Sequence, residues 1–202
     1  MKKIILGVFL LMSALSFAAG RKVPIEKMMV DDTTGIAYVQ GEKTPFTGTV
    51  EVKYDDGTVL ALMEVKNGLM EGTYKILYPS GKTAIIATYK NGKTDGIQKE
   101  YYENGQIEME SLAKNNKKNG IGRFYSITGV LIAEIPFKDD EVDGTIKNYN
   151  EVTGKLETEG EFKNGKAEGT MKEYYPNGKL AIEEKYQNDL REGLSKSYYE
   201  NG

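Results

Sequence analysis

Glutamate and tyrosine are the residues of this chain whose spacing could support chemistry, because it contains no Cys and no His. The usual nucleophiles and metal ligands are therefore missing. Paired carboxylates can hydrolyse glycosides, but a catalytic pair is usually unique in a chain. Here the glutamates recur every 24 or 25 residues, at Glu110, Glu134, Glu159 and Glu183. We interpret them as cross-strand partners of a similar column of Lys and Arg. The sequence predicts no enzyme, no catalytic residue and no cofactor.

Two acidic segments were considered as calcium sites. Asp31-Asp32 and Asp139-Asp140-Glu141 are short loops without the spaced ligands that calcium needs. We interpret both as solvated turns and predict no metal site.

The tyrosines are the best candidates for a binding surface. Ten of the 14 lie five or six residues after a recurring glycine. They could simply pack along a sheet, and exposed tyrosine is also a favoured contact residue at protein interfaces. The candidate partner-binding residues are Tyr78, Tyr101, Tyr102, Tyr125, Tyr149, Tyr174, Tyr175, Tyr198 and Tyr199.

The recurring glycines divide the chain into tandem copies. They are separated by 24, 24, 24, 24, 25 and 24 residues, which indicates a repeat protein whose units pack on their neighbours. A second glycine follows nine residues after the first, or ten in the fifth copy, so that copy carries one inserted residue. The leading glycines are Gly48, Gly72, Gly96, Gly120, Gly144, Gly169 and, for a partial seventh copy, Gly193.

Each copy has turn-forming residues at two positions, as expected for a β-hairpin. Residues 175–179, Tyr-Pro-Asn-Gly-Lys, form a tight turn, and residues 90–96 form a second turn that we expect to be longer. Runs of about six to eight residues between the turns are rich in Tyr, Ile, Thr and Val, the strand formers. The sequence therefore predicts an all-β chain with one hairpin per repeat.

The register at the tight turn has two solutions. A two-residue Asn-Gly turn puts Lys99 opposite Glu110 and Lys172 opposite Glu183 on one face. Pro176 instead favours a type I turn followed by a glycine bulge. That three-residue loop shifts the register by one and puts each pair on opposite faces. We favour the charge-paired register, because it also separates apolar from polar positions.

The first residues predict export. Lys2 and Lys3 precede an apolar run, Ile4 to Leu15, and Ser16-Phe17-Ala18 offers small residues at a cleavage site after Ala18. The alternative, a membrane anchor, needs about 20 apolar residues. We therefore expect residues 1–18 to be a signal peptide and the mature protein to be periplasmic or extracellular.

The mature chain is acidic. Removing the signal peptide leaves 25 Lys and Arg against 30 Asp and Glu. This balance argues against a nucleic-acid partner, because phosphate binding relies on a basic surface.

Residues 19–35 have no clear period, and we expect a poorly ordered lead there, either a plain linker or a cap. The array itself is expected over residues 36–202, beginning with a strand at Ile36 to Val39. The sequence ends within the seventh copy, so strand 194–199 is expected to lie at a sheet edge that frays or pairs with a second molecule. The strand at Ile36 to Val39 is a less favoured edge for such pairing.

The pattern Gly-x-x-x-x-Tyr-Tyr-x-Asn-Gly-Lys-Leu-x-x-Glu resembles the MORN-repeat variant of bacteria, most clearly at residues 96–110 and 169–188. Residues 45–48, Pro-Phe-Thr-Gly, resemble the entry into the array in YwqK-type antitoxin proteins. The fourth and fifth copies depart most from the pattern. The resemblance implies an elongated, single-layer antiparallel meander of tandem 24-residue hairpins.

The resemblance also implies a non-enzymatic protein-binding or scaffold module, with an antitoxin or immunity-like role as one form of it. A toxin that acts in the periplasm or at the cell surface would reconcile that role with export. The alternative is an envelope structural or membrane-surface protein that associates with phospholipid. An acidic chain makes anionic lipid the weaker partner.

Overall fold

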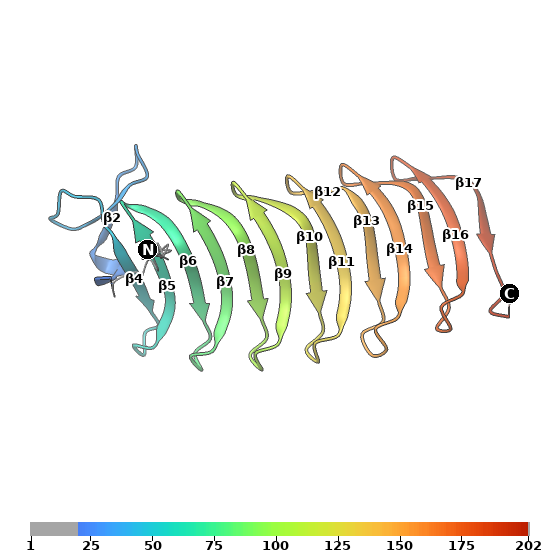
Figure 1. Cartoon of the computed structure of the whole chain (residues 1–202), viewed down its shortest axis with the longest axis horizontal. Helices are drawn as coiled ribbons and strands as arrows, with labels where there is room; N and C mark the ends of the chain where they lie inside the picture. The colour runs from blue at the N-terminus through green and yellow to red at the C-terminus, as the bar shows by residue number, and fades with distance from the viewer. Residues whose placement is uncertain (1–19, 202) are drawn as a thin grey trace, which may run out of the picture.

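The computed structural model describes residues 20–201 and is nearly all β (Figure 1). The predicted signal peptide, residues 1–18, lies outside the described residues. One long sheet carries the strands in chain order, β1-β4-β5-β6-β7-β8-β9-β10-β11-β13-β14-β15-β16-β17, with β12 (Glu141–Val142) attached to β11. From β4 onward neighbouring strands are antiparallel, so the predicted single-layer meander of hairpins is confirmed.

The strands of each hairpin are six to nine residues long. They are β4 (Gly48–Lys53), β5 (Val59–Lys66), β6 (Leu69–Leu77), β7 (Thr83–Lys90), β8 (Lys93–Tyr101), β9 (Ile107–Lys114), β10 (Lys117–Tyr125), β11 (Leu131–Lys138), β13 (Gly144–Tyr149), β14 (Leu156–Lys163), β15 (Lys166–Tyr174), β16 (Leu180–Gln187) and β17 (Leu190–Ser197). Turns line both long edges of the array.

The tight turns are three-residue loops with a glycine bulge, except in the fifth copy, where the inserted residue makes a four-residue loop between Asn150 and Lys155. At Tyr102 the backbone carbonyl accepts from the N–H of Gly105 at 2.8 Å, and the N–H donates to the carbonyl of Gln106 at 2.9 Å. Gly105 has φ +91° and Gly178 has φ +85°, both in the left-handed region that a glycine bulge requires. The turn favoured by proline chemistry is therefore the one that forms.

The charge-paired register also forms. Lys99 lies opposite Glu110, and Lys172 opposite Glu183. A second bulge makes both results compatible: Tyr101 faces Ile107 but Glu100 faces Met109, so one extra residue lies between them. The expectation that a three-residue loop separates the charge columns is wrong, because this bulge restores the register.

The second bulge also corrects the predicted faces. Unbroken alternation along the strand, as the favoured register assumes, would put the residues directly after the tight turn on the face of Ile85 and its equivalents; these residues include Thr83, Leu131 and Leu180. They pair with Leu77, Tyr125 and Tyr174 instead and so share the face of the charged residues.

The other turn is short, contrary to the prediction. Asn91 and Gly92 have φ of +49° and +76° and form a two-residue loop, while residues 93–96 already belong to β8. Two positive φ values are typical of a type I′ hairpin turn, whose twist matches that of the strands. In the copy at Asp139-Asp140, Oδ1 of Asp140 accepts from the N–H of Lys118 at 2.7 Å.

Five of the seven leading glycines lie inside strands, at bulges on this second edge, and the other two, Gly48 and Gly144, begin β4 and β13. Gly72 has φ +103°, and Oε2 of Glu64 on the neighbouring strand accepts from the N–H of Thr73 at 2.6 Å. A Cβ at Gly72 would collide with that carboxylate. Glycine therefore serves both the backbone conformation and the close approach of a neighbouring side chain.

The N-terminal lead is an ordered cap, which corrects the expectation of a poorly ordered segment. β1 (Lys22–Pro24) pairs in parallel with β4, a short 3₁₀ turn (Ile25–Lys27) follows, and β2 (Met28–Val30) pairs with β3 (Ala37–Val39) in a separate two-stranded sheet. The predicted strand at Ile36 to Val39 is thus not an edge of the main sheet. The buried core cluster lies here and consists of Val23, Val39, Phe46, Val50 and Val65.

At the other end, β17 pairs with β16 only, within the part of the chain that the structure describes. All its residues are exposed. This agrees with the expectation of an edge strand at residues 194–199, although its pairing with a second molecule stays a prediction.

Candidate functional site

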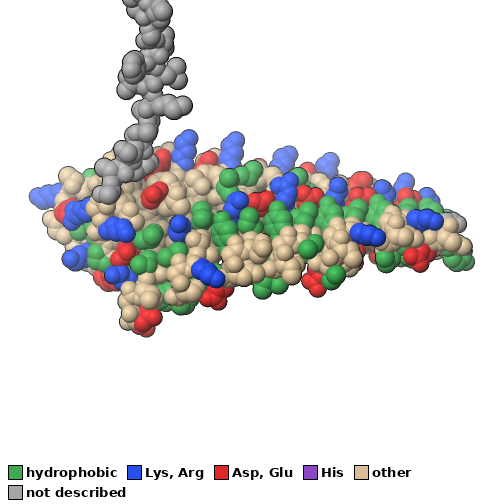
Figure 2. Space-filling view, turned by 60° about the horizontal axis from the view of Figure 1, so that its bottom comes forward, with side chains coloured by type: hydrophobic (Ala, Val, Ile, Leu, Met, Phe, Trp, Pro, Cys, Tyr) green, Lys and Arg blue, Asp and Glu red, His purple; other side chains and the backbone are tan. Residues whose placement is uncertain are grey.

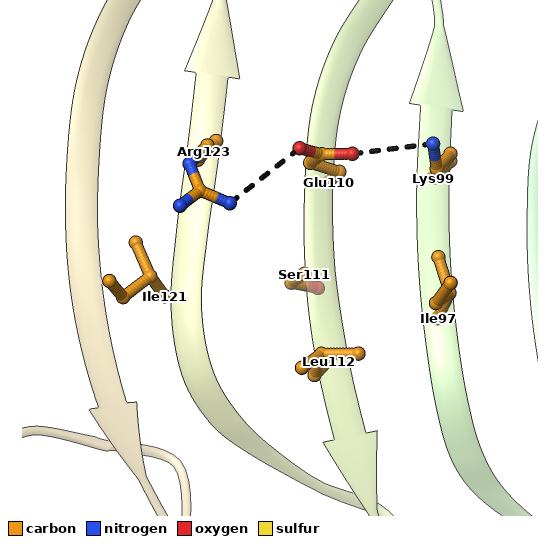
Figure 3. A pocket seen from close by; sticks show the side chains of 7 residues that line it. All are labelled: Ile97, Lys99, Glu110, Ser111, Leu112, Ile121 and Arg123. Carbon is orange, nitrogen blue, oxygen red and sulfur yellow. Dashed lines mark ion pairs between the residues drawn. The ribbon is translucent and has the colours of Figure 1, made fainter.

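One face of the sheet carries a row of charges that crosses nine neighbouring strands, β8 to β11 and β13 to β17. We call it the ladder face. Adjacent members are direct cross-strand partners and alternate in sign throughout: Lys99, Glu110, Arg123, Glu134, Lys147, Glu159, Lys172, Glu183 and Lys196. Each glutamate thus lies between two basic residues, as Figure 3 shows for Glu110 between Lys99 and Arg123.

The ion pairs along this row are of ordinary length. Glu110 lies 3.3 Å from Nζ of Lys99 and 3.8 Å from Nη1 of Arg123. Nε of Arg123 lies 3.0 Å from Oε1 of Glu134. The glutamate side chains are only 21–26% exposed, so they are better shielded than typical surface carboxylates.

Three of the predicted tyrosines complete this row. The hydroxyls of Tyr125, Tyr149 and Tyr174 donate to the carboxylates of Glu110, Glu134 and Glu159, at 3.0, 3.0 and 2.7 Å. Each tyrosine reaches back 15 residues to the preceding hairpin. These tyrosines therefore connect adjacent repeats, and their hydroxyl groups already have partners.

The pKa values reflect these contacts. Burial, followed by the hydrogen bond to Glu159, raises the pKa of Tyr174 to about 12. The pKa values of Tyr125 and Tyr149 are raised for the same reasons. The hydrogen bond from Tyr174 is the main cause of a lowered pKa at Glu159, with Lys172 adding to it. The shifts favour a protonated Tyr174 and an ionised Glu159, which are the forms that this hydrogen bond needs.

A second set of predicted tyrosines holds the edge of the sheet. The hydroxyls of Tyr78, Tyr102 and Tyr175 donate to the backbone carbonyls of Tyr101, Tyr125 and Tyr198, each 23 residues further on. They connect the tight turn of one repeat to the next.

The nine candidate tyrosines do not form one continuous surface. They separate into ladder-face and turn-edge sets, and seven of them are half-buried. Only Tyr198 and Tyr199, on the last repeat, are more exposed, at 40% and 83%.

The sequence reasoning missed an apolar patch on the ladder face. Ile97, Leu112 and Ile121 are 50%, 48% and 45% exposed. They lie beside the charged row and, with it, line a hollow of about 370 Å³ (Figure 3). Ile97 pairs with Leu112, and Ile121 with Pro136. We call Ile97, Leu112, Ile121 and Pro136 the apolar patch.

The signal for this patch was present in the repeat alignment. At the positions that correspond to Ile97 and Ile121, the other complete copies have Thr49, Thr73, Thr145 and Thr170. Thr88 occupies the place of Leu112 in the second copy and pairs with Thr73. Among the six complete copies, only the third and fourth carry large aliphatic side chains here, so the patch is a local departure from the pattern.

Two other features of the described residues lie outside the ladder face. A groove of about 500 Å³ lies between the cap and the sheet, lined by Met28, Met63 and Leu69 among other apolar residues, with Lys93 and Asn116 also on its wall. Asp31 is used locally, since its Oδ1 accepts from the backbone N–H groups of Thr33 and Thr34. No group of three or more acidic residues within 20–201 is arranged to hold a metal ion.

The distribution of side-chain types along the sheet is visible in Figure 2. A band of apolar side chains runs along the array, with acidic and basic side chains beside it. No helix among the described residues is long and apolar enough to cross a membrane.

Comparison with known families supports the repeat assignment. A family model described as "MORN repeat variant" matches residues 70–91, 94–115, 167–188 and 191–202. These matches support a MORN-repeat protein, and they leave the first copy and the divergent fourth and fifth copies unmatched. MORN repeats suggest a scaffold or binding module. No curated protein shows a significant match to this chain.

Proposed function

We propose that this MORN-repeat chain is a non-enzymatic binding module that acts after export and holds a partner protein against its ladder face. The observation that carries this proposal is the apolar patch. Large aliphatic side chains that are about half exposed stand where neighbouring repeats have threonine. Contiguous exposed apolar residues on a folded surface mark contact sites for other molecules.

The surroundings of the patch favour a protein as partner. Interfaces combine an apolar centre with a polar rim that supplies specificity. Here the centre is Ile97, Leu112 and Ile121, and the rim is the charged row with Lys99, Glu110 and Arg123 at one side. The tyrosine rings beyond the row add further contact area.

The proposal of a non-enzymatic module is supported by the contacts that the ladder-face carboxylates already make. The ladder-face carboxylates accept hydrogen bonds from tyrosine or basic side chains, and they recur from repeat to repeat instead of forming one unique pair. Such groups are suited to stabilising a surface.

Export and an antitoxin-like or immunity-like role are the finer parts of the proposal. Export is supported by the basic and apolar residues 2–15 and the small residues before position 19. The immunity role is supported by the resemblance of residues 45–48 to YwqK-type proteins, and it fits a toxin that acts outside the cytoplasm. Mass spectrometry of the envelope and extracellular fractions should find a chain that begins at residue 19, and an intact chain confined to the cytoplasmic fraction would contradict export.

The binding site is tested by making the patch resemble its neighbours. The triple variant Ile97→Thr, Leu112→Thr and Ile121→Thr should fold normally, because threonine occupies the equivalent positions in other copies. We expect it to lose a partner that the wild-type protein captures from an envelope fraction. A matched control replaces Thr145 and Thr170 by Ser on the same face and should retain that partner.

Equal capture by the triple variant and the wild type would refute the proposed site. Co-sedimentation with phosphatidylglycerol vesicles, abolished in the triple variant, would instead support the envelope and membrane-surface alternative.

A further inference from the structure

We infer that the ladder face also binds a second copy of this chain, in a two-fold dimer that covers the apolar patch. This inference rests on the proposed function, because it names an occupant of the same patch. The occupant is indicated by the charged row, which is self-complementary. A row of alternating charges can meet its own copy with every central Lys or Arg opposite a Glu.

The symmetry axis follows from the signs of the charges. If the axis runs parallel to the strands and between two of them, strands of opposite charge face each other. An axis along the middle of a strand would put Glu110 against its own copy. An axis along the length of the array would put each member of the row against itself. Both alternatives bring like charges together, which costs free energy.

The apolar patch fixes where that axis lies. With the axis between β9 and β10, Leu112 meets Ile121 of the second copy and Ile97 meets Pro136. The same placement puts Glu110 opposite Arg123, and Lys99 opposite Glu134. Moving the axis one strand toward β11 keeps the charges complementary but puts Leu112 against Thr145. Moving it one strand toward β8 puts Arg123 against Ile86 and Ile121 against Thr88.

A third row on the ladder face, in which tyrosine alternates with aliphatic residues, agrees with this arrangement. Tyr101 pairs with Ile107 on one hairpin, and Tyr125 with Leu131 on the next. Across the same axis Tyr101 meets Leu131 of the second copy and Ile107 meets Tyr125, so aromatic rings meet aliphatic side chains. The charged row, the apolar patch and the row that contains Tyr101 and Tyr125 are therefore all complementary about one axis.

The contact is expected to be reversible. Four strands at about 4.8 Å spacing give a patch about 19 Å wide. A stable interface needs about 800 Å² from each partner, which is more than such a patch supplies unless neighbouring strands join. A heterologous partner could therefore displace the second copy, and self-association would regulate access to the binding site.

Charge reversal in two separate variants tests the dimer. Arg123→Glu places glutamate opposite Glu110 of the second copy, and Glu110→Arg places arginine opposite Arg123. Each variant alone should weaken self-association by about tenfold or more. An equimolar mixture should restore it, because the two variants then present opposite charges to each other.

Analytical ultracentrifugation of the purified protein, from micromolar to submillimolar concentration, provides the measurement. The wild-type mass should rise toward that of a dimer, and circular dichroism would confirm that both variants are folded. A wild-type protein that stays monomeric throughout, or a mixture that associates no better than either variant, would overturn the inference.

The outcomes also separate this inference from the proposed function. A monomer that still captures a partner through the patch refutes the dimer and leaves the proposed function intact. A dimer with patch-independent capture supports the dimer and refutes the proposed site.

Discussion

Replacing Tyr174 by Phe removes one hydroxyl and keeps the ring. That hydroxyl donates to Oε1 of Glu159 at 2.7 Å, where Nζ of Lys172 also lies at 3.3 Å. A hydrogen bond to a charged group contributes about 1.5–3 kcal/mol. Because the pair is near the surface, solvent screening reduces this to about 1 kcal/mol. The melting temperature should fall by about 2–4 °C.

Tyr101→Phe is the matched control. Tyr101 has the same place in its repeat, but Ile86 stands where the preceding hairpin would supply the glutamate. We expect its free energy of unfolding to change by less than about 0.5 kcal/mol. Urea denaturation followed by far-UV circular dichroism at neutral pH measures both variants.

The same contact predicts a pH dependence. The folded state raises the pKa of Tyr174 from 10.0 to about 12, so the folded chain keeps this proton more tightly than the unfolded chain. The stabilisation is present below pH 10 and is lost as the pH rises toward 12. At Glu159 the pKa is lowered from 4.5, so that contribution is lost as the pH falls below 4.5. Tyr174→Phe should weaken both dependences.

Two results would refute this reasoning. One is a loss of stability in Tyr174→Phe no larger than in Tyr101→Phe. The other is a double-mutant cycle of Tyr174→Phe with Glu159→Gln in which the coupling energy is below about 0.3 kcal/mol, since residues in contact should couple more strongly.

Four further substitutions test the turns, the interior and the turn-edge tyrosines. Gly105→Val and Gly178→Val should each destabilise by about 1–2 kcal/mol in thermal unfolding, because a Cβ there meets no neighbour but φ is positive; unchanged melting in both would count against the hairpin turns. Ser111→Ala should be neutral or stabilising by up to about 1 kcal/mol, because the buried Ser111 hydroxyl has no hydrogen-bond partner and Ala87 fills the equivalent place; a clear loss of stability would reveal an unrecognised bond. Tyr102→Phe should cost about 1 kcal/mol in urea denaturation, because it removes the bond to the next repeat; no change would show that this bond is dispensable.

The repeat architecture was readable from the sequence because every copy carries its own local signals. Glycines at a fixed period and Asn-Gly turns specify a hairpin whatever lies around it. The register of Lys99 with Glu110 was also predictable, because cross-strand pairs of opposite charge recur with the same period. These features depend on contacts within a repeat or between adjacent repeats.

The bulge beside Tyr101 was decided by the sheet. Turn chemistry and charge pairing appeared to exclude each other, and both were correct because one extra residue per hairpin absorbs the difference. No single residue type recurs at that position, so the bulge could not be predicted from the local sequence. The predicted longer turn at residues 90–96 was wrong for a related reason: Gly96 belongs to a bulge within β8 and not to the loop.

The cap and the binding surface depend on residues that are distant in sequence. β1 is ordered by parallel pairing with β4, and Val23 is buried by Val50 and Phe46, none of which lies in its own segment. The partners of the tyrosine hydroxyls, 15 or 23 residues away, were likewise beyond local pattern reasoning. The sequence by itself determined the repeat and the hairpin, because those are local. Only the tertiary structure decided which tyrosine hydroxyls are hydrogen-bonded and where apolar side chains remain exposed, because both depend on side chains from neighbouring strands.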